Sequence, residues 1–404
     1  MSNVPKLRFK EFSGEWEEKS LEEMSDDTIS YGIVQTGEDI SDGIPCVRVI
    51  DLTANTIDVN NMIKTTKEIS NSYKKTVLNG NEIMFALRGE IGLCKRVTKE
   101  LIGANLTRGV ARINPNTTIA NSDYLIQCLH TSSAKNSIMQ EVNGSALKEI
   151  PLNGLRKVAV YLPSKQEQEK IASFLTSVDS KIEQLTKKES LLSSYKKGVM
   201  QKIFSGEIRF KADDGSEFCE WEEKKIKELF IYKNGGSFES DVIEDGQYNL
   251  ITLNSIDING ELKSEHKRVN INDNSLSKND LIMVLSDVAH GNFLGLTAII
   301  PEDNVYVLNQ RMGALKPKTN NNISFIRFYI NFNQKYFKLH GQGSSQQNLS
   351  KGDIEKFIVS LPCLEEQTKI ANFLSSIDYK IEQVQKQLNS TKEFKKALLQ
   401  QMFV

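Results

Sequence analysis

Hydrophobic residues recur at helical spacing in two long stretches of the chain, three, four or seven positions apart. In the first stretch these positions are Ile171, Phe174, Leu175, Val178, Ile182, Leu185, Leu192, Tyr195, Val199 and Ile203. In the second they are Ile370, Phe373, Leu374, Ile377, Ile381, Val384, Leu388, Phe394, Leu398 and Met402. A narrow apolar stripe on an otherwise polar helix is typical of a helix that packs along another helix. The pattern predicts long helices over residues 164–206 and 363–404, each roughly 60 Å long at about 1.5 Å per residue.

The two helices are nearly the same sequence. Residues 167–184 read EQEKIASFLTSVDSKIEQ and residues 366–383 read EQTKIANFLSSIDYKIEQ, so 13 of 18 positions are identical at an offset of 199. Because each stripe needs an apolar partner, we expect the two copies to pack on each other in antiparallel orientation, as a coiled coil. The positions expected at this packing are Ile171, Leu175, Val178, Ile182, Leu185, Ile370, Leu374, Ile377, Ile381 and Val384.

The remainder of each half has a different pattern. Apolar bursts at 83–87 and 281–285 predict buried strands, with Gly, Asn and Asp marking the turns between strands. The aromatic-rich stretch 324–339 has helical spacing, which indicates a core-facing helix. We therefore expect an α+β fold with a pseudo-twofold internal repeat. Mixed α/β domains are expected over 1–163 and 207–362, and helical spacers over 164–206 and 363–404.

The repeat also predicts where the N-terminal segment lies. Residues 208–211, IRFK, follow the first long helix, and their counterpart, LRFK at 7–10, stands near the start of the chain. We therefore expect residues 1–15 to lie beside the end of the second long helix, which would close the repeat into a ring.

Composition limits the class of protein. A chain of 404 residues suggests more than one domain, and no apolar run approaches the roughly 18 residues of a membrane helix. Its five cysteines are scattered without a CxxC pair, which argues against a disulfide framework or a zinc site. We expect a cytoplasmic protein with no membrane partner and no metal of its own.

Charge and motifs bear on function. With 51 basic and 52 acidic residues, the chain lacks the overall basic excess common in nucleic-acid binders, although the field at one face decides binding. The sequence contains no GxxxxGK[ST], HExxH or GxSxG motif. None of its four histidines stands at catalytic spacing from a cysteine or carboxylate. No catalytic site is predicted.

Polar segments recur at matched places in the two halves. GQGSSQQNLS at 341–350 corresponds to NGSALKEI at 143–150, and residues 309–311 correspond to 105–108. Asn and Gln side chains fit the major-groove edge of adenine, and Arg and Lys fit that of guanine. Each segment alone is more often a solvated loop, but placement beside a duplicated helix favours DNA reading. The candidate DNA-binding residues are Arg88, Asn105, Thr107, Arg108, Ser145, Lys148, Ser286, His290, Asn309, Gln310, Arg311, Gln342, Ser344, Ser345, Gln346, Gln347 and Asn348.

The whole chain resembles the specificity subunit of type I restriction–modification systems. The resemblance rests on EWEEK at 15–19 and 220–224, on GSSQQNLSKGDI at 343–354, and most on the LPxxxEQxKIAxFLxxxDxKI block at 162–182 and 361–381. It implies that each variable region is a target-recognition domain and that the repeated helices are spacers. It also implies no chemistry in this chain. Two modification subunits would bind S-adenosylmethionine, and restriction subunits would bring ATP-driven, Mg²⁺-dependent cleavage.

Two unlike recognition domains would read two unlike half-sites in double-stranded DNA, so the implied target is asymmetric, bipartite and gapped. One alternative is a coiled-coil adaptor that joins proteins and recognises no DNA. Another is a single-chain methyltransferase, which the absence of a Gly-rich cofactor loop and of an Asn/Asp-Pro-Pro-Tyr/Phe tetrapeptide disfavours.

Overall fold

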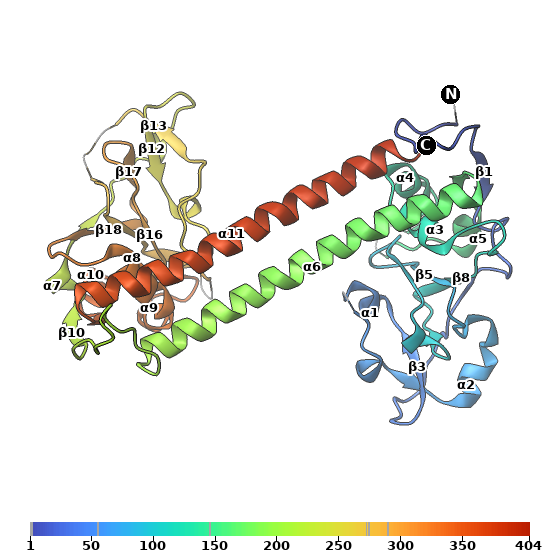
Figure 1. Cartoon of the computed structure of the whole chain (residues 1–404), viewed down its shortest axis with the longest axis horizontal. Coiled ribbons are helices and arrows are strands. Elements are labelled where there is room, and N and C mark those ends of the chain that lie inside the picture. The colour runs from blue at the N-terminus through green and yellow to red at the C-terminus, as the bar shows by residue number, and fades with distance from the viewer. Residues whose placement is uncertain (1–2, 55, 145–146, 272, 274, 289–290) are drawn as a thin grey trace. The chain divides into compact units, whose positions relative to one another are not determined.

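A computed structural model describes residues 3–404 except 55, 145–146, 272, 274 and 289–290 (Figure 1). The chain divides into two compact units. Unit 1 comprises Met1–Lys188 and Val384–Val404, and unit 2 comprises Glu189–Gln383. Each unit contains one variable region together with part of both long helices, α6 (Lys165–Phe204) and α11 (Leu364–Gln401).

Unit 1 contains a four-stranded antiparallel sheet and a three-stranded mixed sheet. The first has the order β2 (Ser30–Tyr31), β8 (Val110–Ile113), β5 (Ile83–Ala86) and β6 (Cys94–Arg96). The second has the order β4 (Lys64–Thr65), β3 (Ile44–Val47) and β7 (Asn105–Leu106). A further pair joins β1 (Glu17–Ser20) to β9 (Ala159–Leu162). The helices of this region are α1 (Val49–Thr53), α2 (Lys67–Ser72), α3 (Ser122–Leu129), α4 (Ser132–Gln140) and α5 (Leu152–Lys157).

Unit 2 repeats this arrangement. Its four-stranded sheet has the order β11 (Phe230–Asn234), β18 (Met312–Pro317), β14 (Leu281–Val284) and β16 (Thr297–Ile299). Its three-stranded sheet has the order β13 (Lys267–Val269), β12 (Tyr248–Ile251) and β17 (Tyr306–Leu308). Two pairs join β10 (Glu222–Lys225) to β20 (Ile358–Leu361) and β15 (Ser286–Val288) to β19 (Gln346–Asn348). The helices are α7 (Ile226–Leu229), α8 (Ile323–Phe332), α9 (Gln334–His340) and α10 (Lys351–Glu355).

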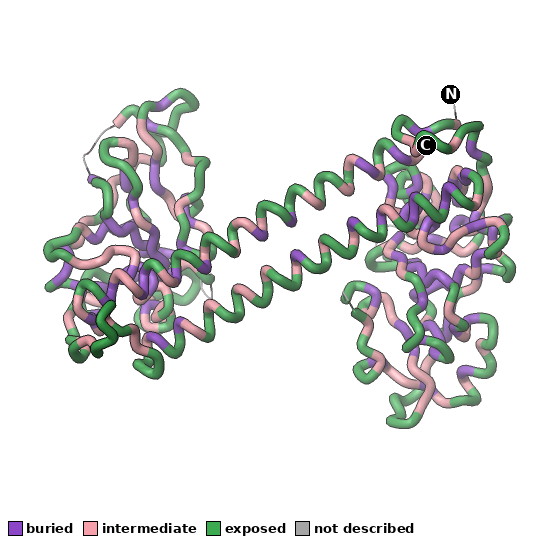
Figure 2. Tube along the Cα trace, viewed as in Figure 1, coloured by how far each residue is buried: buried purple, intermediate pink, exposed green. Residues whose placement is uncertain are grey.

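The predicted strands are confirmed, and the predicted core helix over 324–339 forms as two consecutive helices, α8 and α9, which are separated at Asn333. Every residue of β5 and β14 is buried, as their apolar runs predict. On α8 and α9, Phe325, Phe328 and Phe337 are buried in the core of unit 2. Figure 2 shows buried positions concentrated in the interior of each unit. The expected mixed α/β fold with an internal repeat is therefore confirmed.

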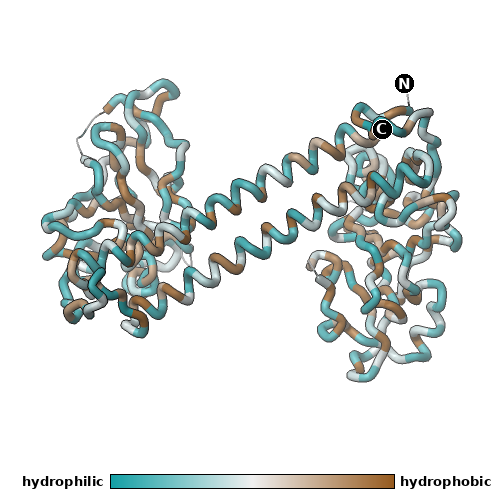
Figure 3. The backbone as a smooth tube through the Cα atoms, in the orientation of Figure 1, coloured by the Kyte–Doolittle hydropathy of each residue, from teal (hydrophilic) through white to brown (hydrophobic). Residues whose placement is uncertain are grey.

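The long helices pack on each other through the predicted stripe. Within unit 1, Leu175 of α6 shares a core with Leu398 and Met402 of α11, and Lys395 bonds Asp179. Within unit 2, the repeat-equivalent Lys196 of α6 bonds Asp378 of α11. As the residue number rises along α6, the residue number of its partner on α11 falls, so the two helices run antiparallel. Figure 3 shows hydrophobic positions recurring among hydrophilic ones along both helices.

Eight of the ten expected stripe positions are buried, and two are partly buried. The buried ones are Ile171, Leu175, Val178, Leu185, Ile370, Leu374, Ile377 and Val384. Ile182 and Ile381 are partly buried against the cores of units 1 and 2.

Two other positions of the apolar pattern do not belong to the stripe. Tyr195 is 54% exposed and Phe394 is 52% exposed. Their neighbours Lys196 and Lys395 lie instead against the facing helix, with ammonium groups paired to Asp378 and Asp179. Because successive helix residues are rotated by about 100°, the aromatic rings then face outward.

The N-terminal segment closes unit 1 as predicted. Leu7 N donates to Gln401 O at 2.8 Å, and the rings of Trp16 and Phe403 lie 6.3 Å apart, centroid to centroid. The expectation that this segment lies beside the end of the second long helix is confirmed for its described residues. Neither long helix, nor any other helix formed by the described residues, is long and apolar enough to cross a membrane.

Candidate nucleic-acid interface

In unit 2, three separate segments meet where β14 ends. Leu285 N donates to Arg311 O at 3.0 Å, and Leu349 N donates to Leu285 O at 2.8 Å. β19 pairs with β15 so that Asn348 faces Ser286, and the backbones of Gln342 and Asn348 exchange two hydrogen bonds. We call this backbone arrangement the unit 2 frame.

In unit 1, the same three segments meet where β5 ends. Leu87 N donates to Gly109 O at 2.8 Å, and Ile150 N donates to Leu87 O at 2.9 Å. The backbones of Glu149 and Arg88 form an isolated antiparallel β-bridge, and Glu149 also exchanges two backbone hydrogen bonds with Asn143. We call this arrangement the unit 1 frame.

Both frames contain a tight loop that requires glycine. Gly144 has φ +95° and Gly343 has φ +119°. A Cβ added at Gly144 would lie 2.3 Å from Leu147 O, and one added at Gly343 would lie 2.1 Å from Gln346 O. Both the positive φ and the lack of space exclude a side chain, so the two loops have the same construction.

Backbone hydrogen bonds fix the correspondence between the frames. Thr107 N donates to Val47 O, and Asn309 N donates to Ile251 O, both at 3.0 Å. Thr107 therefore corresponds to Asn309, Arg108 to Gln310, and Gly109 to Arg311. The sequence matched only the segments 105–108 and 309–311, because short polar segments carry no marker of register. The hydrogen bonds place Arg108 one position before the counterpart of Arg311.

The unit 2 frame brings five predicted residues together around one hollow of about 360 Å³. The lining contains Ser286, Gln310, Arg311, Gln346 and Asn348, from β15, the turn after β17, and β19. The Gln346 amide donates to Ser286 Oγ. Arg311 and Gln310 are exposed, and no side-chain bond is seen for either within the described part of the chain. Ser286 is buried and its hydroxyl accepts the bond from Gln346, so the hollow presents amides and one guanidinium to solvent.

The unit 1 frame presents cations. Arg88, Arg108 and Lys148 are exposed, and none has a side-chain hydrogen bond or ion pair among the described residues. Arg88 lies over Gly109, because a Cβ added at that glycine would be 2.9 Å from Arg88 Nε. The two frames therefore share a backbone but differ in chemistry.

Two predicted contacts are corrected. Asn105 is fully buried, and its amide bonds Ser70, Tyr73 and Thr76. Asn309 is also buried, with its amide bonded to Glu239. Both amides form hydrogen bonds with other residues of the chain, so these side chains have a structural role.

Two further predicted residues, Thr107 and Gln347, are partly buried. The Thr107 hydroxyl is used locally, donating to Val47 O at 3.1 Å. Gln347 lies on the opposite face of β19 from Gln346 and Asn348, against Gly341. Gln342, Ser344 and Ser345 are exposed on the loop, while Ser145 and His290 lie outside the described residues.

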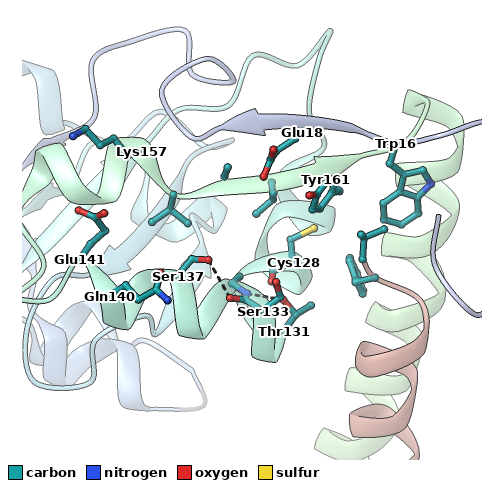
Figure 4. A pocket seen from close by; sticks show the side chains of 16 residues that line it. Trp16, Glu18, Cys128, Thr131, Ser133, Ser137, Gln140, Glu141, Lys157 and Tyr161 are labelled. Carbon is teal, nitrogen blue, oxygen red and sulfur yellow. Dashed lines mark hydrogen bonds between the residues drawn. The ribbon is translucent and has the colours of Figure 1, made fainter. Parts of the chain in front are cut away.

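A separate hollow in unit 1, of about 330 Å³, shows no catalytic arrangement. Figure 4 shows α4 on one side and β1 and β9 on the other, with Trp16 and the residues after α11 at one end. Burial raises the pKa of the Cys128 thiol, which therefore remains protonated at neutral pH. Among the described residues, no group of three or more His, Cys, Asp or Glu side chains could hold a metal ion.

The fold and the frames define an internally duplicated protein with one similarly built polar surface on each repeat. The family model for the type I restriction modification DNA specificity domain matches residues 14–193 and again 219–392. The chain belongs to the family of type I restriction–modification specificity subunits, which confirms the resemblance.

Named relatives agree with this assignment. The chain is 31% identical over 184 residues to the type I restriction enzyme EcoBI specificity subunit of Escherichia coli, a match covering 45% of this chain and 39% of that one. It is 25% identical over 349 residues to the MjaVIII specificity subunit of Methanocaldococcus jannaschii, covering 81% of this chain and 79% of that one.

Solved structures share the fold. The type I restriction–modification S subunit from M. genitalium superposes with a TM-score of 0.64 at 17% identity, covering 99% of both chains. A chain from a structure on complex assembly and conformational transition of the type I R-M system gives a TM-score of 0.52 at 14% identity, covering 95% of this chain and 96% of that one.

Proposed function

We propose that this chain reads DNA sequence for a type I restriction–modification complex, with each frame contacting one half of an asymmetric, gapped target in double-stranded DNA. The observation that carries the proposal is one backbone frame built twice with different side chains. A shared frame lets both units approach DNA in the same way, while unlike side chains select unlike bases.

The side chains suggest what each frame reads. Gln310, Gln346 and Asn348 of the unit 2 frame carry amides that can pair with adenine, and Arg311 can pair with guanine. Arg88, Arg108 and Lys148 of the unit 1 frame favour guanine and nearby phosphates. The half-site of unit 1 should therefore contain guanine, and that of unit 2 should contain adenine.

Partner subunits supply the chemistry in this proposal. Two modification subunits bind S-adenosylmethionine, restriction subunits bind ATP and Mg²⁺, and this chain itself is not catalytic. Tyr195 of α6 and Phe394 of α11 occupy the same place in the repeat, 199 positions apart, and both are more than half exposed. Because exposed aromatic residues are common anchors at interfaces, we assign each the docking of one modification subunit.

The experiment is DNA binding by the chain co-expressed with its modification subunits. Three duplexes are compared: the full target identified by sequencing methylated DNA, and two versions with one half-site scrambled. Scrambling either half-site should weaken binding, and replacing Arg88 and Arg108 with Ala should remove the sensitivity to one half-site only. Salt-sensitive binding that ignored sequence would contradict the proposal and would favour the adaptor alternative.

A further inference from the structure

Unit 1 concentrates positive charge at a place that is separate from its frame. A hollow of about 520 Å³ lies where the start of α4 meets α6 and the last turns of α11. Its polar lining is His130, Ser132, Lys135, Lys392, Lys395, Lys396 and Gln400. We call this feature the lysine hollow.

The charges facing the lysine hollow do not cancel. Asp179 of α6 pairs with Lys395, and Glu393 lies 3.9 Å from Lys396. Lys135 and Lys392 are exposed and have no hydrogen-bond or ion-pair partner in the described part of the chain. Four ammonium groups therefore face two carboxylates. The pKa of His130 is lowered to about 4 by burial, with Lys395 and Lys135 adding to the effect, so this ring stays neutral at pH 7.

The start of α4 adds donors to the lysine hollow. Thr131 caps this helix by accepting a hydrogen bond from Ala134 N at 3.2 Å, and the Ser132 hydroxyl lines the hollow. Backbone N–H groups in the first turn of a helix lack intrahelical partners and favour an anion. Lysines, a hydroxyl and a helix start together suit a phosphate group.

The helix α4 relates the lysine hollow to the unit 1 frame. Its nine residues, Ser132–Gln140, begin at the hollow and end shortly before the frame loop 143–149. Such a helix is about 14 Å long, which corresponds to roughly four base pairs of B-DNA. A duplex that contacts the frame and runs along α4 would bring a phosphate a few nucleotides away to the hollow.

We propose that the lysine hollow binds a phosphate of the DNA backbone, about four base pairs from the bases that the unit 1 frame reads. The proposal rests on the proposed function and adds a contact that is independent of sequence. Its role is to raise affinity and fix the position of the duplex on unit 1, leaving base selection to the frame.

The test replaces Lys392 and Lys396 with Gln in the complex with modification subunits. The plot of log affinity against log salt should become shallower by about one, and affinity should fall about fivefold near 0.15 M salt. The loss should be equal for the target and for a scrambled duplex. Replacing exposed Lys67 and Lys99, elsewhere in unit 1, with Gln changes the charge equally and should leave the salt slope unchanged.

A modified duplex locates the contact. A single uncharged methylphosphonate linkage, moved stepwise from three to five base pairs beyond the half-site, should weaken the unsubstituted complex at one position and leave the Lys392→Gln/Lys396→Gln complex unaffected. An unchanged salt slope would overturn the proposal, as would loss of co-purifying modification subunit, which would assign the hollow to an acidic protein surface. If the proposed function itself failed, the unsubstituted complex would not distinguish target from scrambled duplex, which is a different result.

Discussion

Among single residues, the pleat of β19 decides which amides line the hollow of the unit 2 frame. Gln346 and Asn348 line the hollow of the unit 2 frame, whereas Gln347 between them faces Gly341. Replacing Gln346 and Asn348 with Ala should relax or weaken recognition of one half-site, at roughly 1–3 kcal/mol for each bidentate amide–base pair removed. Gln347→Ala is the matched control and should keep the methylation pattern. Sequencing of methylated DNA measures both, and equal effects from the two changes would contradict the assignment.

His130 predicts a pH dependence of stability. Burial, with Lys395 and Lys135 adding to it and Asp179 opposing it, lowers the pKa of His130 to about 4. In the unfolded chain its pKa is about 6.5, so the unfolded state takes up the proton first as pH falls. The stabilisation is complete above pH 6.5 and is lost as pH approaches 4, on the order of 3 kcal/mol.

Urea unfolding measured from pH 7 to pH 4 checks this expectation. The unfolding free energy of the unsubstituted protein should fall more steeply between pH 6.5 and 4 than that of His130→Asn, which cannot titrate. His340→Asn changes an exposed histidine of unit 2, and its unfolding free energy should fall between pH 6.5 and 4 as steeply as that of the unsubstituted protein. Parallel curves for His130→Asn and the unsubstituted protein would refute the role of this residue.

The sequence pattern located the frames but could not separate their exposed members from their buried ones. Asn309 and Arg311 stand two positions apart in the same polar segment, yet one is bonded to Glu239 inside the protein and the other lines the hollow. Glu239 is 70 residues from Asn309 in sequence, so the pattern contains no sign of the bond. Likewise, the bidentate pair of Arg8 with Glu167 joins residues 159 positions apart and was not predicted.

Among the elements, the long helices followed closely from periodicity, because an apolar stripe needs a partner along its whole length. Two positions differ from the pattern. Lys196 and Lys395 occupy stripe positions because their ammonium groups find carboxylates on the facing helix, which a hydrophobic pattern cannot show. The outward-facing Tyr195 and Phe394 are therefore free for a partner protein.

Replacing Tyr195 and Phe394 with Ala should release the modification subunits while leaving the chain folded. Truncating an aromatic anchor typically costs about 2 kcal/mol of binding or more, a loss of roughly thirtyfold for each site. The fully buried Leu175 is the contrasting position, where Ala should reduce the unfolding free energy by about 2–5 kcal/mol. Co-purification and thermal unfolding separate the two effects, and retention of both subunits by Tyr195→Ala/Phe394→Ala would rule out these anchors.

For the whole molecule, the repeat predicts tolerance to circular permutation. Leu7 bonds Gln401 in unit 1, so a short linker can join the chain ends, and exposed Gly206 after α6 offers a place to open the chain. The permuted protein should bind DNA and modification subunits with affinity unchanged within about threefold, because the contacts within each unit are kept. The same linker with an opening at Leu185, inside α6, is the control and should abolish assembly. Loss of DNA binding or of modification-subunit binding by the Gly206 permutant would contradict the ring arrangement.

The most direct test of two frames reading two half-sites is to make the frames identical. In this chimera, residues 208–361 are replaced by a second copy of residues 7–162, which keeps both long helices and gives each unit the unit 1 frame. Sequencing of methylated DNA from cells that express the chimera with the modification subunits measures the target. The chimera should methylate a symmetric target composed of two inverted copies of one half-site. Methylation of the original asymmetric sequence by the chimera would contradict the assignment of one half-site to each frame.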